Sequence, residues 1–158
     1  MKKIIRLVLT VVLLINLTAC NKDDDYKAPH EHYNDIGKTI ITCFENKDKE
    51  TLISLFSENM QASRDLETEI EDAFNYMDSE IIEYGLIHSS VGGGEIREEG
   101  YTLREGGGFI EDIITESGTK YEIYFKIRDV DKENEENVGL MYFDIRKEIY
   151  SEIGESSH

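Results

Sequence analysis

The sequence predicts an α+β fold, in which N-terminal helices pack on one face of a curved antiparallel β-sheet. Two observations lead to this prediction. Apolar residues recur every three to four positions up to about residue 77, and they alternate with polar residues from about residue 79 onward. Turn residues then separate the alternating segments, as they do between antiparallel strands. Helices that come first and strands that follow together favour α+β over an alternating α/β arrangement.

Three helices are predicted in the first half, each with one apolar face. The apolar residues of the first recur at spacings of three, four, one and three: Tyr33, Ile36, Ile40, Ile41 and Phe44. Asp48 is the expected N-cap of the second helix, and Ser63 is the expected cap of the third. The apolar faces of these two helices comprise Leu52, Leu55 and Phe56, and Leu66, Ile70, Ala73, Phe74 and Met77. We expect the core to include Phe44, Leu55, Phe56, Phe74 and Phe125.

Four strands are predicted in the second half. They cover residues 81–90, 109–115, 119–129 and 138–146. Residues 116–118 read Glu-Ser-Gly and predict a hairpin turn between the second and third strands. One face of the third strand is apolar and consists of Tyr121, Ile123, Phe125 and Ile127.

Two glycine triplets, residues 92–94 and 106–108, bracket an acidic stretch with no clear periodicity. A phosphate-binding loop would need Lys-Ser or Lys-Thr and the start of a helix after the glycines, and neither triplet is followed by these. Acidic neighbours such as Glu95 and Glu105 would also repel phosphate. We therefore expect mobile turns or bulges at both triplets.

The N-terminal segment has the pattern of a secretion signal. A basic start at residues 2–6 precedes an apolar run of 11 residues, 7–17, whereas a membrane-spanning helix needs about 20. Leu-Thr-Ala-Cys follows at residues 17–20 and resembles the lipobox of bacterial lipoproteins, in which the cysteine becomes the lipidated first residue. We therefore predict that residues 1–19 are a signal peptide and that Cys20 is lipidated. The alternative is a secreted protein with an incidental cysteine.

The rest of the chain is predicted to contain one domain. Residues 20–30 are the lipidated cysteine and a polar, flexible tether, which contains the only proline of the chain. Residues 31–150 form the single α+β domain, and residues 151–158 form a tail. A chain of 158 residues is long enough to bury one sizeable core.

The charge of the chain limits its partners. It has 17 basic and 34 acidic residues, a formal net charge of −17. The signal peptide holds three of the basic residues and no acidic one, so the mature chain has a net charge of −20. Nucleic acids and anionic membrane surfaces repel such a body. We expect no nucleic-acid partner, and contact with the membrane through the lipid anchor only.

Three segments resemble a family of small Gram-positive lipoproteins. They are Asn-Lys-Asp-Lys-Glu leading into Leu-Ile-Ser-Leu-Phe-Ser at residues 46–57, Lys-Tyr-Glu-Ile-Tyr-Phe at 120–125, and Asn-Val-Gly-Leu at 137–140. The family is known as domain of unknown function 5104, and the resemblance covers about residues 35–147. It implies the fold and the location. It assigns no catalytic residue, because the family has no established activity.

This family is similar in architecture to the nuclear-transport-factor-two-like, or cystatin-like, superfamily. The resemblance implies that the helices and the curved sheet form a cone with a mouth. Members of the superfamily include ketosteroid isomerases, dehydratases and polyketide cyclases, and also proteins without catalytic activity. An isomerase of this shape would use a carboxylate base with phenol or carboxylic acid donors. The available groups are Tyr84, Tyr124, Tyr142, Asp112 and Asp144, and so many acids and phenols place some pairs together by chance.

Other reactive residues have simpler interpretations. Cys43 lies beside apolar residues on the first predicted helix, so we expect it to be a buried small hydrophobe rather than a catalytic thiol. His30 and His32 are two residues apart and do not share a helix face, and His88 is the only histidine inside the predicted fold. Residues 129–140 start like a calcium loop, but they lack its glycine and its final glutamate. We therefore predict no catalytic residue, no metal site and no cofactor.

The function class that these observations favour is a binding module. We expect a lipid-anchored protein on the extracytoplasmic face of a bacterial membrane, whose partner is a small molecule or another envelope protein. One alternative is an isomerase or dehydratase that uses a carboxylate in the cone. The other is an acidic protective protein, similar to an immunity protein, that masks a basic toxin or enzyme. An open cavity with a buried, partnered carboxylate would favour the enzyme, and a filled cone would favour the binding module.

Overall fold

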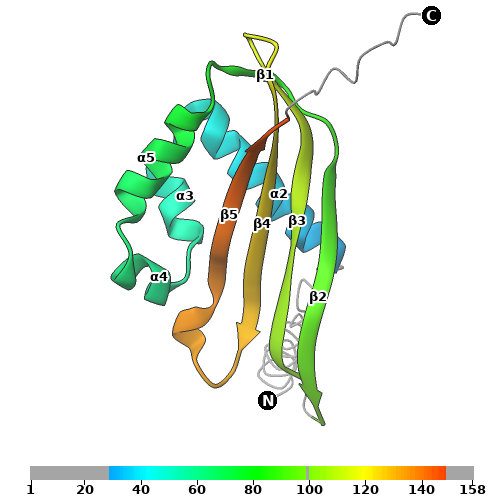
Figure 1. Ribbon diagram of the computed structural model, residues 1–158. Coiled ribbons are helices and arrows are strands. Elements are labelled where there is room, and N and C mark those ends of the chain that lie inside the picture. Colours follow the sequence, from blue (N-terminus) through cyan, green and yellow to red (C-terminus); the bar gives the residue numbers. More distant parts are fainter. Residues whose placement is uncertain (1–28, 99, 149–158) are drawn as a thin grey trace, which may run out of the picture.

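The computed structural model describes residues 29–98 and 100–148, which form helices followed by one curved, open antiparallel sheet (Figure 1). The predicted α+β class is confirmed. The predicted signal peptide, most of the tether, Cys20 and the tail lie outside the described residues. The elements are α2 (Pro29–Asn46), α3 (Lys49–Leu55), α4 (Glu58–Ser63), α5 (Leu66–Tyr76), β1 (Ile81–Glu83), β2 (Ile87–Arg97), β3 (Gly100–Thr115), β4 (Lys120–Asp131), the 3-10 turn η1 (Glu135–Asn137) and β5 (Gly139–Lys147).

The sheet is antiparallel throughout. β1 and β2 pair with β3, β4 pairs with its other side, and β5 pairs with β4. α2 crosses one face of the sheet and packs on β2 and β3, while α3, α4 and α5 lie to the side of β5 (Figure 1). The sheet therefore has one face covered by α2 and one face open to solvent.

The single strand predicted over residues 81–90 is wrong, because the structure divides it into β1 and β2. β3 bulges opposite the break, where Asp112 has a positive φ of 50°. The backbone N–H of Gly85 donates to the carbonyl of Glu111 at 2.9 Å, and the N–H of Glu111 donates to the carbonyl of Leu86 at 3.2 Å. A bulge displaces one residue from the ladder and bends the strand, so the facing edge must break with it.

The glycine triplets do not form mobile turns. Residues 92–94 lie within β2, where the pairing register shifts between Val91 and Gly94, so a bulge is confirmed there. Residues 106–108 lie inside β3 and pair without a shift to β4, so the expected turn or bulge is wrong. The reason is steric. A Cβ at Gly106 would collide with the ring of Tyr33 on α2, so only glycine lets this helix approach the strand.

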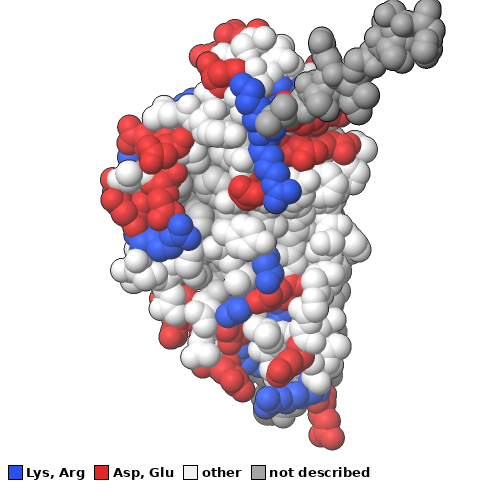
Figure 2. Space-filling model, in the orientation of Figure 1, with Lys and Arg blue, Asp and Glu red and all other residues white. Residues whose placement is uncertain are grey.

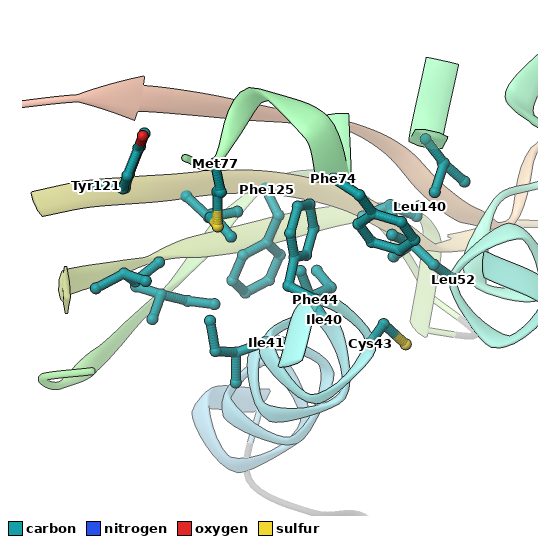
Figure 3. Packing of buried hydrophobic residues seen from close by; sticks show 14 of the residues in the cluster. Ile40, Ile41, Cys43, Phe44, Leu52, Phe74, Met77, Tyr121, Phe125 and Leu140 are labelled. Atoms are coloured by element: carbon teal, nitrogen blue, oxygen red, sulfur yellow. The ribbon is translucent and has the colours of Figure 1, made fainter. Parts of the chain in front are cut away.

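Most of the predicted core is confirmed. Phe44, Phe74 and Phe125 are 1%, 6% and 4% exposed, and their rings lie together between α2, α5 and the sheet (Figure 3). The rings of Phe44 and Phe74 meet edge to face, with centroids 4.9 Å apart. Phe56 is also buried, but Leu55 is only partly buried. α3 ends at Leu55, and the fully buried residue of that helix is Leu52, one turn earlier.

The helix caps follow the expected chemistry at one position and not at another. The Asp48 side chain accepts a hydrogen bond from the backbone N–H of Thr51 at 3.0 Å, which confirms this N-cap. Ser63 is instead the last residue of α4, a helix that the sequence did not predict. Asp65 caps α5 by accepting from the N–H of Thr68 at 3.3 Å. The predicted cap at Ser63 is therefore wrong, because α4 occupies that residue and α5 begins two residues later.

Asp78, which follows α5, forms hydrogen bonds with the β3–β4 hairpin. Its carboxylate accepts hydrogen bonds from the hydroxyls of Thr115, Ser117 and Thr119, at 2.8, 2.9 and 2.5 Å. The hydroxyl of Thr119, followed by the other hydroxyls and by the ammonium of Lys147, holds the pKa of the Asp78 carboxyl well below its usual range. The folded state thus favours the ionised form of this group.

Truncation of Phe74 tests the core. Phe74→Ala should lower the free energy of unfolding by about 3–5 kcal/mol, because a buried ring is lost and its neighbours cannot fully collapse into the space. Tyr76→Ala is the matched control, since Tyr76 lies on the same helix but is 53% exposed, and it should cost less than about 1 kcal/mol. The measurement is reversible urea unfolding of residues 21–158, which contain every residue of the core cluster. Equal costs for the two variants would contradict this assignment of the buried face.

The lowered pKa of Asp78 predicts a pH dependence. The carboxylate of the folded state stays ionised at a pH where the unfolded chain takes up the proton, so its stabilisation is complete above the unfolded pKa of about 4 and is lost as the pH falls below it. Asp78→Asn should therefore destabilise the domain more at pH 7 than at pH 3. Glu116→Gln, in the same turn, is the control, because the Glu116 carboxylate accepts no hydrogen bond from a hydroxyl of residues 29–98 or 100–148. A difference between wild type and Asp78→Asn that stays constant across this range would contradict the assignment.

Candidate functional site

The concave side of the sheet is filled by side chains from α2. The ring of Tyr33 lies against the backbone of Gly106, and a Cβ at Gly37 would lie 2.7 Å from Ile87 and 3.2 Å from Phe125. Tyr33, Ile87 and Phe125 therefore pack closely between α2 and the sheet at these two glycines.

One carboxylate is buried under α2, but it serves packing. Asp129 accepts a hydrogen bond from the hydroxyl of Tyr33 at 3.1 Å, and its same oxygen lies 2.9 Å from Nε of Arg104. The other oxygen of Asp129 is buried and has no hydrogen-bond partner among the described residues. Burial and the negative charge of Asp129 raise the pKa of Tyr33 to about 12. This cluster ties α2 to β3 and β4.

The candidates for acid–base chemistry all lie on the outside. Asp112 is exposed in the β3 bulge and pairs with Lys120 at 2.9 Å, while Asp144 is exposed on β5 and pairs with Arg146 at 2.8 Å. Tyr84 is exposed in the link between β1 and β2. The structure does not bring these three groups together, but Asp144 and the candidate Tyr142 line the same groove between α5 and β5, described below.

The other two tyrosine candidates are on the open face of the sheet. Tyr124 donates from its hydroxyl to Glu122 at 2.9 Å, and this hydrogen bond to a carboxylate raises the pKa of the phenol. The guanidinium of Arg146 lies 4.3 Å from the centre of the Tyr124 ring. Tyr142 is 48% exposed.

The remaining candidates have structural roles in the described part of the chain. Cys43 is 2% exposed and unpaired with another cysteine, and burial raises the pKa of its thiol to about 11. It is therefore a buried hydrophobe, as predicted, because so little thiolate exists near neutral pH. His30 joins α2 to β2 through Ser89, and His88 stacks on Phe109 with ring centroids 4.5 Å apart.

The structure gives no support to a metal site in the described residues. No group of three or more histidine, cysteine or acidic side chains is placed to hold an ion there. In the loop after β4, Asp131 pairs with Arg128 at 3.1 Å, accepts from the N–H of Asn134 at 3.0 Å and accepts from Asn137 at 3.2 Å. Its carboxylate oxygens are thus engaged inside the loop. His32 lies beside Tyr33, with ring centroids 5.4 Å apart.

A groove of about 320 Å³ separates α5 from β5, and we take it as the candidate site. Its floor is apolar and consists of Phe56, Leu66, Ile70, Ala73, Phe143 and Ile145. Tyr76 and Tyr142 stand at its sides and are 53% and 48% exposed. Such a floor, open to solvent, is where a protein gains binding energy by covering apolar surface.

The rim of this groove is charged and mainly acidic. The acidic residues that line it are Glu69 and Asp72 of α5 and Asp144 of β5. The one basic residue that lines it is Arg64. Arg64 is already paired with Glu69, its Nε lying 3.0 Å from the carboxylate. Figure 2 shows the acidic side chains gathered over α5 and a largely uncharged surface between that helix and the middle of the sheet. An acidic rim beside an apolar floor favours a ligand that combines positive charge with apolar groups.

A second hollow, of about 340 Å³, lies on the open face of the sheet and adjoins the groove at Tyr142. Its floor is the backbone of both glycine triplets, and Phe109 and Tyr124 stack beside it with centroids 5.5 Å apart. Lys126 and Glu105, 2.6 Å apart, form an ion pair at this hollow. The two charged residues that line this hollow are therefore paired with each other.

The sequence did not single out most residues of the groove. Tyr142 was named as a possible acid–base group, whereas Phe143, Ile145 and Ala73 were placed only as core or strand residues. Tyr76 lies off the predicted apolar stripe of its helix, and an exposed tyrosine there was the one available signal. The groove depends on how far α5 stands from β5, which no local pattern encodes.

Comparison with known proteins adds the family. None of the helices in residues 29–98 and 100–148 is long and apolar enough to cross a membrane. No curated protein matches the chain significantly. Residues 39–149 match the family described as domain of unknown function (DUF5104), which covers more than half of the chain. The chain therefore belongs to the DUF5104 family.

Proposed function

We propose that this protein is a lipid-anchored binding module on the extracytoplasmic face of a bacterial membrane, and that its binding site is the groove between α5 and β5. The observation that carries the binding role is the groove itself, an apolar floor open to solvent on a strongly acidic protein. The partner is a component of the envelope, either a small molecule or a protein.

The anchor is supported by the sequence pattern at residues 17–20 and by the charge of the body. With a net charge of −20, the mature chain has no electrostatic means of holding to an anionic membrane. Acyl chains on Cys20 supply that attachment, since each buried CH₂ contributes about 0.8 kcal/mol. α2 begins at Pro29, nine residues after Cys20 in the sequence.

The packed interior also supports binding over catalysis. A general base must reach its substrate within hydrogen-bond distance, and a cone that is filled by Tyr33 and Phe125 does not admit one. The groove instead offers apolar contact area, two exposed tyrosines and a charged rim. Tyrosine and a mixed apolar and polar surface are typical of recognition sites.

Replacement of Cys20 tests the anchor. Cys20→Ala should abolish incorporation of labelled palmitate and release the protein from the membrane fraction, because the acceptor thiol is gone. Cys43→Ala is the matched control, since it removes the other cysteine of the chain and should leave labelling unchanged. Palmitate incorporated into the Cys20→Ala protein would contradict the lipoprotein assignment.

Site-specific photocrosslinking tests the groove in the anchored, full-length protein. A benzophenone amino acid at position 76, at the side of the groove, should give a discrete crosslinked species in intact cells. The same amino acid at position 96 is the control, because Ile96 is 67% exposed on β2, at the opposite edge of the sheet. No species from position 76, or the same species from both positions, would contradict a partner in the groove.

A further inference from the structure

β5 is an edge strand with backbone groups that face away from the sheet. The N–H of Glu148 donates to the carbonyl of Lys120 at 2.9 Å, so the backbone groups of Glu148 point toward β4. This contact shows which residues of β5 have backbone groups that point the same way. These groups alternate along an antiparallel strand. Those of Tyr142, Asp144 and Arg146 therefore point toward β4. Those of Phe143 and Ile145 point toward the open edge.

The chain itself already uses the lower end of this edge. Phe56 and Leu140 form a parallel bridge, in which the N–H of Ser57 donates to the carbonyl of Leu140 at 3.3 Å. No further backbone bridge between the described helical segments and β5 follows it. The edge is thus paired with an extended segment at Leu140. Beside Phe143 and Ile145, the groove lies where such a segment would continue.

The groove and the edge are adjacent and present complementary features. The side chains of Phe143 and Ile145 form part of the apolar floor, while Asp144 between them lies on the rim. A strand added along this edge would place alternate side chains over the floor and the others beside Asp144. This arrangement needs an extended polypeptide with apolar residues at every second position.

The charge of the rim determines which residues are favoured at the other positions of the added strand, beside Asp144. From Asp65 to Asp72, α5 and its cap carry five acidic residues and no basic one. Glu69 pairs with Arg64, and Lys49 lies 3.8 Å from Glu71 and 3.9 Å from Glu67, both of which are mostly exposed. Lysine or arginine in the added strand would therefore be favoured, and a second copy of this acidic chain would be repelled.

We propose that the groove binds an extended, basic segment of a partner protein, which adds to the free edge of β5. Its apolar side chains fill the groove between α5 and β5, and its lysines or arginines lie beside Asp72 and Asp144. Main-chain hydrogen bonds to Phe143 and Ile145 hold the strand, and the groove and the acids select its sequence. This inference rests on the proposed binding role of the groove.

The probe for this proposal is the peptide acetyl-Lys-Val-Lys-Val-Lys-Val-Lys-amide, titrated into the chain from Asn21 to His158 and followed by NMR. It should bind with a Kd below about 1 mM, with amide shifts concentrated at positions 142–147. Two matched peptides test whether binding depends on the charge of the peptide and on its backbone hydrogen bonds. Replacement of every lysine by glutamate, or methylation of the three central backbone nitrogens, should each weaken binding at least about tenfold.

Two pairs of variants place the peptide in the groove. Asp72→Lys should weaken its binding about tenfold, whereas Glu31→Lys, with the same change of charge at the start of α2, should change it less than about twofold. Ala73→Met fills the groove and should weaken binding about tenfold, whereas Ala62→Met, on the exposed face of α4, should change it less than about twofold. Unfolding midpoints that match wild type show that each variant is folded.

Several outcomes would overturn the proposal. They are equal binding of the glutamate or methylated peptide, no binding of the lysine peptide at about 1 mM, and equal effects within either pair of variants. A concentration-dependent dimer whose amide shifts fall on β5 would assign the edge to a second copy and would also overturn it. Loss of peptide binding with crosslinking from position 76 intact would reject strand addition alone, whereas loss of both would reject the groove as the binding site.

Discussion

The close approach of α2 to the sheet is the constraint on which the rest of the structure depends. Gly37 on the helix lies against Ile87 and Phe125, and Gly106 on β3 lies against the ring of Tyr33. A Cβ at either glycine would push the helix outward and open the space that these side chains fill. Close packing here converts a potential cavity into core, because van der Waals contact falls off steeply with distance. It also places Tyr33 over Asp129, so the buried carboxylate gains a donor within reach.

This packing determines where a ligand can bind. Because the concave face is filled, a ligand can bind at the side of the sheet. There, α3, α4 and α5 lie beyond β5 rather than over the sheet. α5 buries Leu66, Ile70 and Phe74 on its inner side. The remaining apolar surface between α5 and β5 has no neighbour among the described residues, and it becomes the groove. In the same arrangement, no strand of residues 29–98 or 100–148 pairs with the upper part of the outer edge of β5.

Charge is distributed in a way that is consistent with this use of the surface. The partly buried acids of the sheet have cationic partners: Glu105 pairs with Lys126 and Arg128, and the ammonium of Lys126 holds the pKa of its carboxyl below the usual range. Along α5, Glu69 pairs with Arg64, while Glu67 and Glu71 share Lys49 at 3.9 and 3.8 Å, so acids outnumber their cations and the helix keeps a net negative field. Such a field adds little to stability but steers a basic partner and repels other copies of the protein.

The sequence by itself determined the class of fold, the apolar face of each helix, the hairpin turn at residues 116–118 and the inward face of β4. These features are local, because spacing along the chain sets which side chains share a face. The tertiary structure alone decided four other features. Asp65 rather than Ser63 caps α5, Leu55 remains partly exposed, the second glycine triplet lies inside a strand, and the strand predicted over residues 81–90 is broken. It also decided that the cone is filled and that the groove lies beside β5. Apart from the cap, which depends on where α4 ends, each of these depends on the distance between elements far apart in the chain, and no periodicity in the sequence records that distance.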